Sequence, residues 1–202
     1  LSACRAHPTR PDPAPAGFPP CAALGEYAGV LRELLLAYKD RGRHRLARPL
    51  GHLLAEVVLA VAGPVDALLL VPVPDTPAAA RARHGDHLWR LARPAAAALR
   101  RAGVAAGLAR PLRARSRPDS AGLDAAARLA VAAEALRPRP ARAAALRRRL
   151  AHRPVILLDD VVTTGATLAA AAGRLASVGV PVAGAAVLAA TRRWRTDHPN
   201  GS

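Results

Sequence analysis

Two adjacent carboxylates and a loop rich in threonine and glycine follow a short apolar run in the last third of the chain. The run Val155–Leu158 has the composition of a strand buried on both faces, and Asp159 and Asp160 come at its carboxyl end, where open α/β sheets place their ligands. A helix start with free backbone N–H groups, hydroxyl donors and a small glycine suits a phosphate monoester. The residues expected to form this loop are Thr163, Thr164, Gly165, Ala166 and Thr167.

This arrangement predicts a site for a ribose 5-phosphate. Asp159 and Asp160 could accept hydrogen bonds from the 2′- and 3′-hydroxyl groups of the sugar, and could help to neutralise a metal ion that bridges the sugar and a diphosphate. The simpler alternative is that Asp160 caps a turn and the threonines cap the helix. Capping requires neither two adjacent acids nor the sequence Thr-Thr-Gly-x-Thr, which favours the ligand-binding interpretation.

Composition limits the fold and the function further. The chain has 202 residues, which predicts one domain, and a formal net charge of +16. Such a surface could hold nucleic acid, an anionic membrane or a polyphosphate, but the bulk charge alone identifies no site. Aromatic residues make up 2% of the chain, so single-stranded nucleic acid would find almost no rings to stack on. The absence of an 18-residue apolar run and of a signal-peptide segment leads us to expect a soluble, cytoplasmic protein.

The elements that must position the site alternate between helix and strand. Residues 24–39 have apolar positions at helical spacing, which places Lys39 at a helix end, where the helix dipole alone would favour a cation. The alternation predicts a parallel, layered α/β sheet. The other expected helices cover residues 46–61, 88–101, 123–136, 141–150 and 167–178, the expected strands 66–74, 104–112, 155–158 and 182–190, and a polar loop 75–87.

The two ends of the chain look different from its middle. Six prolines within residues 1–23 predict an extended arm appended to the domain, and residues 194–202 are expected to form a disordered tail. Cys4 and Cys21 are too few for a disulfide framework. The chain contains no methionine, which fits either a fragment or a mis-started reading frame.

The motif at residues 155–167 resembles the phosphoribosyl-pyrophosphate (PRPP) binding motif of type I phosphoribosyltransferases. Other segments are similar to the ComF family, the competence-associated, amidophosphoribosyltransferase-like branch, and the similarity runs from about Tyr27 to about Arg193. It implies a type I phosphoribosyltransferase fold over residues 24–193, with a mostly parallel sheet flanked by helices. The segments that carry it, besides the motif, are Tyr27–Gly29, Ala37–Gly42, Leu70–Pro74, Arg81–Arg83, and Asp119–Leu123 with Arg128.

The resemblance also implies roles for individual residues. Asp159 and Asp160 would bind the ribose hydroxyls and act with Mg²⁺, and Thr163–Thr167 would bind the 5-phosphate. The reaction would be displacement at ribose C1 by an unknown nitrogen nucleophile, with pyrophosphate leaving through a transition state of oxocarbenium character. The residues that would match the pyrophosphate loop and its basic neighbours are Pro72, Val73, Pro74, Lys39, Arg81 and Arg83.

Departures from the family pattern keep a second interpretation open. The chain reads Arg83-His84-Gly85-Asp86-His87 where many members read Arg-Gly-Phe-Asn-Gln, and it has Ser120 where glutamine is common. These changes favour a non-catalytic module that senses PRPP or a nucleotide while a basic face binds DNA or a protein of the competence machinery. Two basic runs, 110–117 and 137–153, would supply that face, although solvated helix surfaces are the commoner explanation of such runs. His84 and His87 lie in the polar loop, where solvated histidines are common, and contact with a substrate is the less favoured alternative.

Many members of the family carry an N-terminal four-cysteine zinc knuckle. Here Cys4, His7 and Cys21 are three candidate ligands, which do not close a tetrahedral structural site. We therefore expect the arm to be the remnant of a knuckle that does not bind zinc. The acceptor substrate and the oligomeric state, with a homodimer as one alternative, stay open.

Overall fold

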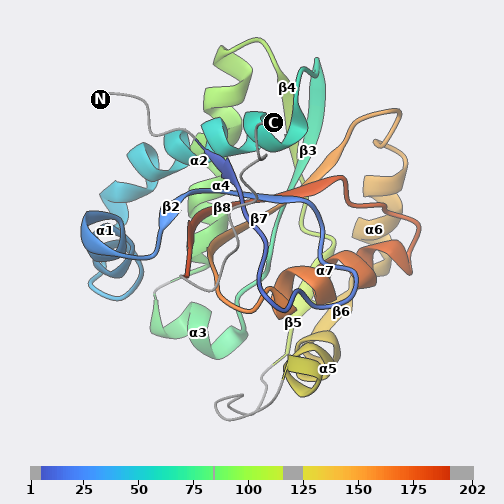
Figure 1. Ribbon diagram of the computed structural model, residues 1–202. Coiled ribbons are helices and arrows are strands. Elements are labelled where there is room, and N and C mark those ends of the chain that lie inside the picture. Colours follow the sequence, from blue (N-terminus) through green and yellow to red (C-terminus); the bar gives the residue numbers. More distant parts are fainter. Residues whose placement is uncertain (1–5, 84, 116–124, 192–202) are drawn as a thin grey trace, which may run out of the picture.

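A six-stranded sheet forms the centre of the computed structural model, which describes residues 6–83, 85–115 and 125–191 (Figure 1). The strand order is β1-β2-β8-β7-β3-β4, and every neighbouring pair is parallel except β1 and β2. The expectation of an α/β protein with a mostly parallel sheet is therefore confirmed. The strands are β1 His7–Pro8, β2 Cys21–Glu26, β3 Ala67–Pro72, β4 Ala105–Leu108, β7 Val155–Val162 and β8 Gly184–Ala190.

Helices flank the sheet and connect its strands. Helix α2 packs against β2, β8 and α4, whereas α7 packs against α5 and β6; Figure 1 shows α5, α6 and α7 grouped at the lower right, away from α2. None of the helices in the described part of the chain has both the length and the apolar character needed to span a bilayer. The helices are α1 Gly29–Lys39, α2 Ala47–Ala62, α3 Pro77–Ala82, α4 His87–Arg101, α5 Ala125–Ala135, α6 Pro140–Arg147 and α7 Ala166–Ala176, with a 3₁₀ turn, η1, at His44–Leu46.

The two central strands are apolar because helices or loops cover both of their faces. All seven residues of β8 are buried, and so are the first four residues of β7. Small side chains in β8 let its neighbours come close: a Cβ atom at Gly184 would collide with Val61 of α2. This double coverage explains why residues 155–158 form a continuous apolar run and not an alternating one.

A close contact between α2 and α4 fixes the position of the helix that follows the candidate pyrophosphate loop. A Cβ atom at Gly51 would lie 2.5 Å from Cγ of Pro94 and 2.9 Å from the carbonyl oxygen of Leu91. Only glycine leaves room for this approach. The contact matters for the site because α4 begins at His87.

The prediction of a helix over residues 24–39 is wrong for its first third. Residues Cys21–Glu26 form strand β2, which pairs in parallel with β8, and α1 begins only at Gly29. Cys21–Leu24 are all buried. Burial against β8 therefore outweighs the helical spacing of the apolar positions in setting their conformation. Strand β2 also crosses the expected limit of the arm at residue 23, and Phe18 is buried in the core.

Two further expectations about local structure are wrong. The polar loop 75–87 contains a short helix, α3, whose start is stabilised by the Thr76 hydroxyl, which accepts a hydrogen bond from the Ala79 N–H at 3.2 Å. Leu136, expected at the end of a helix, lies in β6 (Leu136–Pro138), which pairs with β5 (Leu112–Ala114) in an antiparallel hairpin. Both segments are too short to show a clear periodicity.

Several residues considered in the sequence lie outside the described residues. They are Cys4, His84, the segment Asp119–Leu123 and the tail 194–202; the side chain of Arg128 is likewise not described.

Candidate functional site

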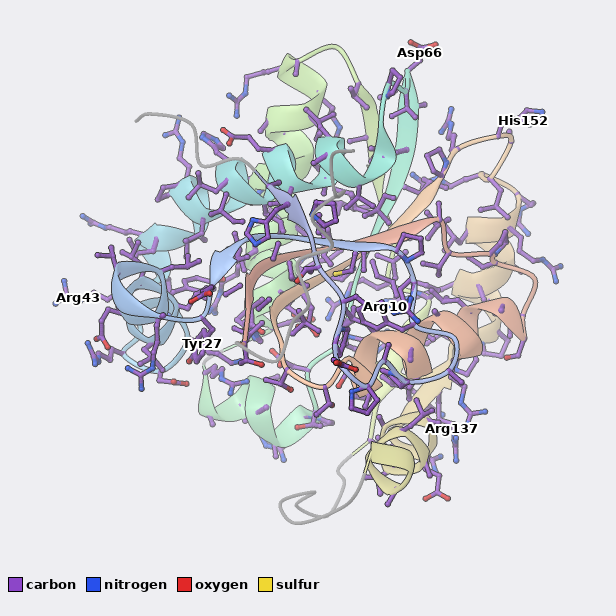
Figure 2. The ribbon with its side chains drawn as sticks, viewed as in Figure 1. Arg10, Tyr27, Arg43, Asp66, Arg137 and His152 are labelled. Carbon is purple, nitrogen blue, oxygen red and sulfur yellow. The ribbon has the colours of Figure 1, made fainter. Side chains whose placement is uncertain are left out.

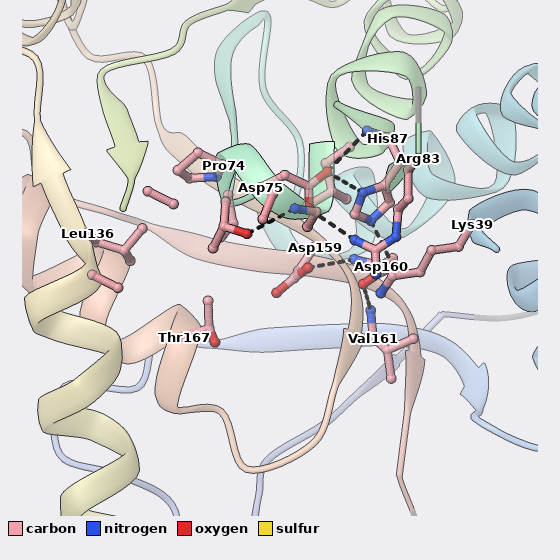
Figure 3. A pocket seen from close by; sticks show the side chains of 17 residues that line it. Lys39, Pro74, Asp75, Arg83, His87, Leu136, Asp159, Asp160, Val161 and Thr167 are labelled. Atoms are coloured by element: carbon pink, nitrogen blue, oxygen red, sulfur yellow. Dashed lines mark hydrogen bonds and ion pairs between the residues drawn. The ribbon is translucent and has the colours of Figure 1, made fainter. Parts of the chain in front are cut away.

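A pocket of about 490 Å³ opens at the carboxyl ends of β3 and β7. The two acids of the motif lie within β7, because this strand continues to Val162 and does not end at Leu158 as the sequence predicted. Figure 3 shows Lys39, Arg83 and His87 on one side of it, Leu136 on the other, and Asp159 and Thr167 between them. Three regions far apart in the sequence thus meet here: the end of α1, the segment that joins β3 to α4, and the end of β7 with the first turn of α7. This is the edge at which parallel α/β sheets bind ligands.

Asp160 is fully engaged by protein groups. Its Oδ2 atom lies 2.7 Å from Lys39 Nζ and 3.0 Å from His87 Nε2, and its Oδ1 atom accepts a hydrogen bond from the backbone N–H of Val161 at 2.8 Å. The residue is 4% exposed. Since both oxygens are already bonded, Asp160 holds two cationic side chains in place.

His87 links Asp160 to a third carboxylate, that of Asp75. His87 Nδ1 lies 2.6 Å from Asp75 Oδ2, which also accepts a hydrogen bond from the backbone N–H of His87 at 3.3 Å. The hydroxyl of Tyr38 donates to the carbonyl oxygen of His87 at 2.6 Å. The imidazole is thus fixed at both nitrogens and its backbone is fixed from α1.

The structure excludes one of the interpretations of His87 that the sequence left open. Its side chain is buried and is not a solvated loop histidine. The sequence held one usable signal: Asp86 is a favourable N-cap residue, and its carboxylate accepts a hydrogen bond from the Trp89 N–H at 2.9 Å. This cap makes His87 the first residue of α4, but nothing local identifies Asp75 and Asp160 as its partners.

Asp159 differs from its neighbour in having an oxygen left for a ligand. Its Oδ1 atom accepts a hydrogen bond from the backbone N–H of Asp160 at 2.9 Å, and its other oxygen makes no hydrogen bond or ion pair within the described residues. The side chain lines the pocket, as Figure 3 shows. Of the two acids, Asp159 is therefore the one that can accept a hydrogen bond from a bound hydroxyl or bind a metal ion.

The two acids also differ in their electrostatics. Burial raises the pKa of Asp159 well above its usual value, and the charge of Asp160 raises it further. Burial alone would also raise the pKa of Asp160, but the hydrogen bond from His87 and the charge of Lys39 outweigh it, so the pKa of Asp160 falls below its usual range. Asp160 is thus the permanent anion of the pair.

The basic members of the cluster are held in their charged forms by these acids. Burial by itself would lower the pKa of His87, but hydrogen bonds to Asp160 and Asp75 raise it to about 9. Burial would likewise lower the pKa of Lys39, and the charge of Asp160 more than compensates and raises it. His87 is accordingly an imidazolium at neutral pH, and it can donate a hydrogen bond to each of the two acids.

Arg83 extends the cluster toward solvent, whereas Arg81 lies apart from it. Arg83 Nη1 is 3.4 Å from Asp75 Oδ1, Arg83 Nε is 3.7 Å from Asp40 Oδ1, and the side chain lines the pocket. Arg81 is exposed on α3 and does not line the pocket. The structure therefore brings one of the two expected loop arginines to the site.

Only part of the segment expected to match a pyrophosphate loop lines the pocket. Val73 and Pro74 follow β3 directly and line the pocket together with Asp75. Pro72 is the last residue of β3, and the structure places it within the sheet and not at the pocket.

The threonine loop encloses a separate small hollow next to Asp159. About 30 Å³ in volume, it is lined by Thr163, Thr164, Gly165 and Ala166, and Thr167 lines both this hollow and the main pocket. Helix α7 starts at Ala166, directly after Gly165, which has a φ angle of +75°. The start of α7 therefore lines a space beside the acid that has an oxygen left for a ligand, and its first N–H, that of Ala166, donates to the Thr164 hydroxyl oxygen at 3.5 Å.

The N-terminal segment covers this loop. A Cβ atom at Gly165 would lie 2.7 Å from ring carbons of Phe18 and 2.8 Å from Cγ of Pro11. Figure 1 shows the residues before β2, in dark blue, running past the start of α7. Residues that the sequence assigned to an appended arm thus support the candidate phosphate loop.

The wall opposite the charged cluster is apolar. It consists of Ala114 from β5, Ala135 from the end of α5, and Leu136 from β6. These residues come from the β5–β6 hairpin region, which the sequence did not predict. A ligand in the pocket would have its charged part at Lys39 and Arg83 and an uncharged part against this wall.

The described residues contain no group of three or more His, Cys, Asp and Glu side chains placed to hold a metal ion. An Mg²⁺ ion that binds together with a phosphorylated substrate does not need such a group. It needs only one or two carboxylates besides phosphate oxygens and water, and Asp159 has an oxygen left. Cys21 lies buried in β2, where burial and the charge of Asp159 raise the pKa of its thiol to about 12. It therefore stays a neutral thiol.

Comparison with known proteins does not identify the chain: no protein-family model and no curated protein matches it.

Proposed function

We propose that the chain is a phosphoribosyltransferase-fold protein of the ComF type that binds PRPP and transfers its phosphoribosyl group to a nitrogen nucleophile, with release of pyrophosphate. The observation that carries the proposal is that Asp159, Lys39 and Arg83 line one pocket, while the loop that starts α7 lines a small hollow next to it and shares Asp159 and Thr167 with that pocket. A sugar that carries a phosphate at one end and a diphosphate at the other needs those three features together. Their order around the pocket fits that ligand.

Different residues would contact different parts of PRPP. Asp159 accepts hydrogen bonds from the ribose hydroxyls through its remaining oxygen, and Thr163–Thr167 with the start of α7 bind the 5-phosphate. Arg83 and Lys39 face the diphosphate. Asp160 and His87 touch no ligand in this assignment; they keep Lys39 and the end of β7 in position.

The chemistry then consists mainly of positioning and charge. The bond between ribose C1 and the pyrophosphate oxygen breaks with its electron pair going to pyrophosphate, and a bond from the nucleophile nitrogen to C1 forms while that nitrogen releases a proton to solvent. Lys39 and Arg83 stabilise the charge that develops on the leaving group, a contribution that grows as the bound ligand displaces water. Mg²⁺, when bound with the substrate and Asp159, would supply further neutralisation of the diphosphate.

The acceptor would lie against the apolar wall. Leu136, Ala135 and Ala114 offer contact area and no charged group, so the uncharged part of a base or amine would pack there. The wall contains no aromatic ring to stack on, which favours a small acceptor over an extended ring system.

The ion pair between Lys39 and Asp160 supports a second candidate function, a module that binds PRPP without turning it over. A lysine already neutralised at 2.7 Å by a buried acid stabilises a leaving pyrophosphate less than a free cation would. The two candidates share the ligand and differ only in catalysis.

Two experiments test the proposal in sequence. Calorimetric titration of the chain with PRPP and Mg²⁺ should show saturable binding that Asp159→Asn weakens and Arg81→Gln leaves unchanged. Absence of binding, or equal binding by Asp159→Asn, would refute both candidates. Release of pyrophosphate in the presence of a panel of bases and amines then separates them, since tight binding without release supports the non-catalytic module.

A further inference from the structure

A second basic region lies between α2 and α4, away from the acids of the candidate site. It consists of two neighbouring hollows of about 490 and 440 Å³, and both are lined by His44 and Arg45 of the η1 turn. The two hollows adjoin at these two residues, and their lining reaches from the end of α1 to the last turn of α4. We call the pair of hollows the α2/α4 groove.

The groove has two rows of basic side chains. One row comes from η1 and α2, and the other comes from α4. The α4 residues are spaced by three and then by eight positions, so they lie near one face of the helix. Eight residues separate His44 from His52 and eleven separate Arg90 from Arg101, so the rows extend over about 12 and 16 Å. The rows contain His44, Arg45, Arg48 and His52 on one side, and Arg90, Arg93 and Arg101 on the other.

The close packing of the two helices brings the rows together. At Gly51 there is no space for a Cβ atom, because Pro94 of α4 fills it. Gly51 stands next to His52, and Pro94 stands next to Arg93. A larger residue at position 51 would push the two rows apart.

Acidic side chains are few at the groove, where Arg41 is paired with Glu33 at 3.3 Å. No Asp or Glu lines either hollow, and within the described residues Arg45, Arg48 and Arg93 form no ion pair. Two other arginines lie against histidines: Arg90 Nη1 is 3.1 Å from His44 Nδ1, and Arg101 Nη2 is 3.2 Å from His52 Nε2. Imidazole nitrogens orient the guanidinium groups without neutralising them.

The groove presents guanidinium and imidazole groups and almost nothing else. Its remaining lining residues are alanine, glycine, leucine and proline, with no Phe, Tyr or Trp ring and no hydroxyl or amide side chain. Nucleic-acid bases need such groups for stacking or for edge recognition. Guanidinium groups, in contrast, match phosphate oxygens with two parallel hydrogen bonds.

We propose that the α2/α4 groove binds a linear polyphosphate, a chain of phosphates without sugars or bases. Such a chain carries a charge at every phosphate and has no base or sugar that needs a partner of its own. Arg45 and Arg48 on one side and Arg90, Arg93 and Arg101 on the other fit a narrow, densely charged chain. A single-stranded nucleic acid would leave its bases without partners in the groove, whereas a duplex, whose bases pair with each other, is the alternative that the duplex probe tests.

This site is separate from the one proposed for PRPP. Arg93 lies nearly two helical turns after His87, and the groove residues Arg45, Arg48 and Arg93 line no part of the acidic pocket. The two regions are connected through Arg90, which donates a hydrogen bond to the carbonyl oxygen of Arg83 at 3.4 Å. Binding in the groove can therefore be tested independently of PRPP.

The test compares two triple variants that lose the same charge. The groove variant is Arg45→Gln/Arg48→Gln/Arg93→Gln, and the control is Arg142→Gln/Arg148→Gln/Arg153→Gln, three exposed arginines in or after α6. Figure 2 labels Arg43, beside one end of the groove, and Arg137, shortly before α6, on opposite sides of the molecule. The probes are long-chain inorganic polyphosphate, a mixed-sequence single-stranded oligonucleotide and a DNA duplex.

Fluorescence anisotropy at several salt concentrations should show polyphosphate binding that weakens as salt increases. The groove variant should lose about tenfold or more in affinity, while the control variant loses much less. PRPP titration of both variants, together with their unfolding in urea, shows whether each is folded. Because PRPP binding is read separately, failure of one proposal does not affect the other.

Three results would overturn the inference. Equal losses in the two triple variants would mean that polyphosphate responds to total charge and not to the groove. Binding of either nucleic acid in preference to polyphosphate, with loss in the groove variant, would assign the groove to nucleic acid instead. No binding of any probe by the folded chain at low salt would leave the groove without an anionic polymer as its ligand.

Discussion

His87 Nε2 lies 3.0 Å from Asp160 Oδ2, and this contact joins two residues 73 positions apart in the sequence. It makes the two acids of the motif unequal. Asp160 is held by His87 and Lys39 and acts as an internal anion, while Asp159 keeps an oxygen for a ligand. A motif of two identical residues thus contains one acid that protein groups occupy fully and one acid that lines the pocket with an oxygen left over.

The first prediction separates these two roles. Asp160→Asn should destabilise the protein by about 3 kcal/mol, because it leaves His87 and Lys39 charged and buried without their anion. Asp159→Asn should leave the free energy of unfolding unchanged or higher, since burial already disfavours its charge, but it should weaken PRPP binding about tenfold or more. Urea denaturation and calorimetry measure the two effects. Equal destabilisation by both variants would contradict the assignment.

The second prediction concerns pH. The pKa of His87 is about 9 in the folded protein and about 6.5 in the unfolded chain. A raised pKa stabilises the folded state fully below pH 6.5, and the contribution disappears as pH rises through 9. The difference corresponds to at most about 3 kcal/mol.

Unfolding free energies between pH 6 and pH 10 should therefore fall with increasing pH in the native chain. In His87→Gln the slope over this window should be smaller, because glutamine does not titrate. NMR titration of the His87 ring nitrogens gives the pKa directly, and a value near 6.5 would disprove the imidazolium assignment.

The third prediction compares the two arginines of the segment before α4. Arg83→Gln should lower the affinity for PRPP about tenfold, because Arg83 lines the pocket and contacts Asp75. Arg81→Gln should change the affinity by less than about twofold, because Arg81 is exposed away from the pocket. The two variants lose the same charge, so an equal effect would point to long-range electrostatics in place of contact.

The fourth prediction tests the cover over the phosphate loop. Gly165→Ala should destabilise the protein by about 2 kcal/mol, since the residue has a φ angle of +75° and its new Cβ atom would collide with Phe18. The double variant Gly165→Ala/Phe18→Ala should be more stable than the sum of the two single effects predicts. Additive effects in urea denaturation would show that residue 18 does not cover the loop.

The fifth prediction concerns the α2/α4 contact. Gly51→Ala should destabilise the protein by about 2 kcal/mol, because the added methyl group meets Pro94 and the carbonyl oxygen of Leu91. Gly173→Ala is the matched control: it lies in α7 with no atom within 4 Å of the new Cβ, so it should be neutral or stabilising by up to about 1 kcal/mol. Thermal unfolding of both variants checks this pair.

The sequence by itself determined the layered α/β class and the local form of the motif. Four consecutive apolar residues before Asp159 fit only a strand covered on both faces, and the alternation of helix and strand lengths implied parallel pairing. The threonine-glycine loop and the start of α7 followed from short-range backbone chemistry. Features that depend on neighbours in the chain were thus open to prediction.

Only the tertiary structure decided which residues share the site. His87, Asp75 and Tyr38 come from separate segments, and no local pattern distinguishes a buried histidine between two acids from a solvated loop histidine. Residues 21–26 became a strand because β8 offered them a partner, against a helical spacing in their own sequence. Burial and pairing between distant segments set these outcomes, and their energies appear only when the chain is folded.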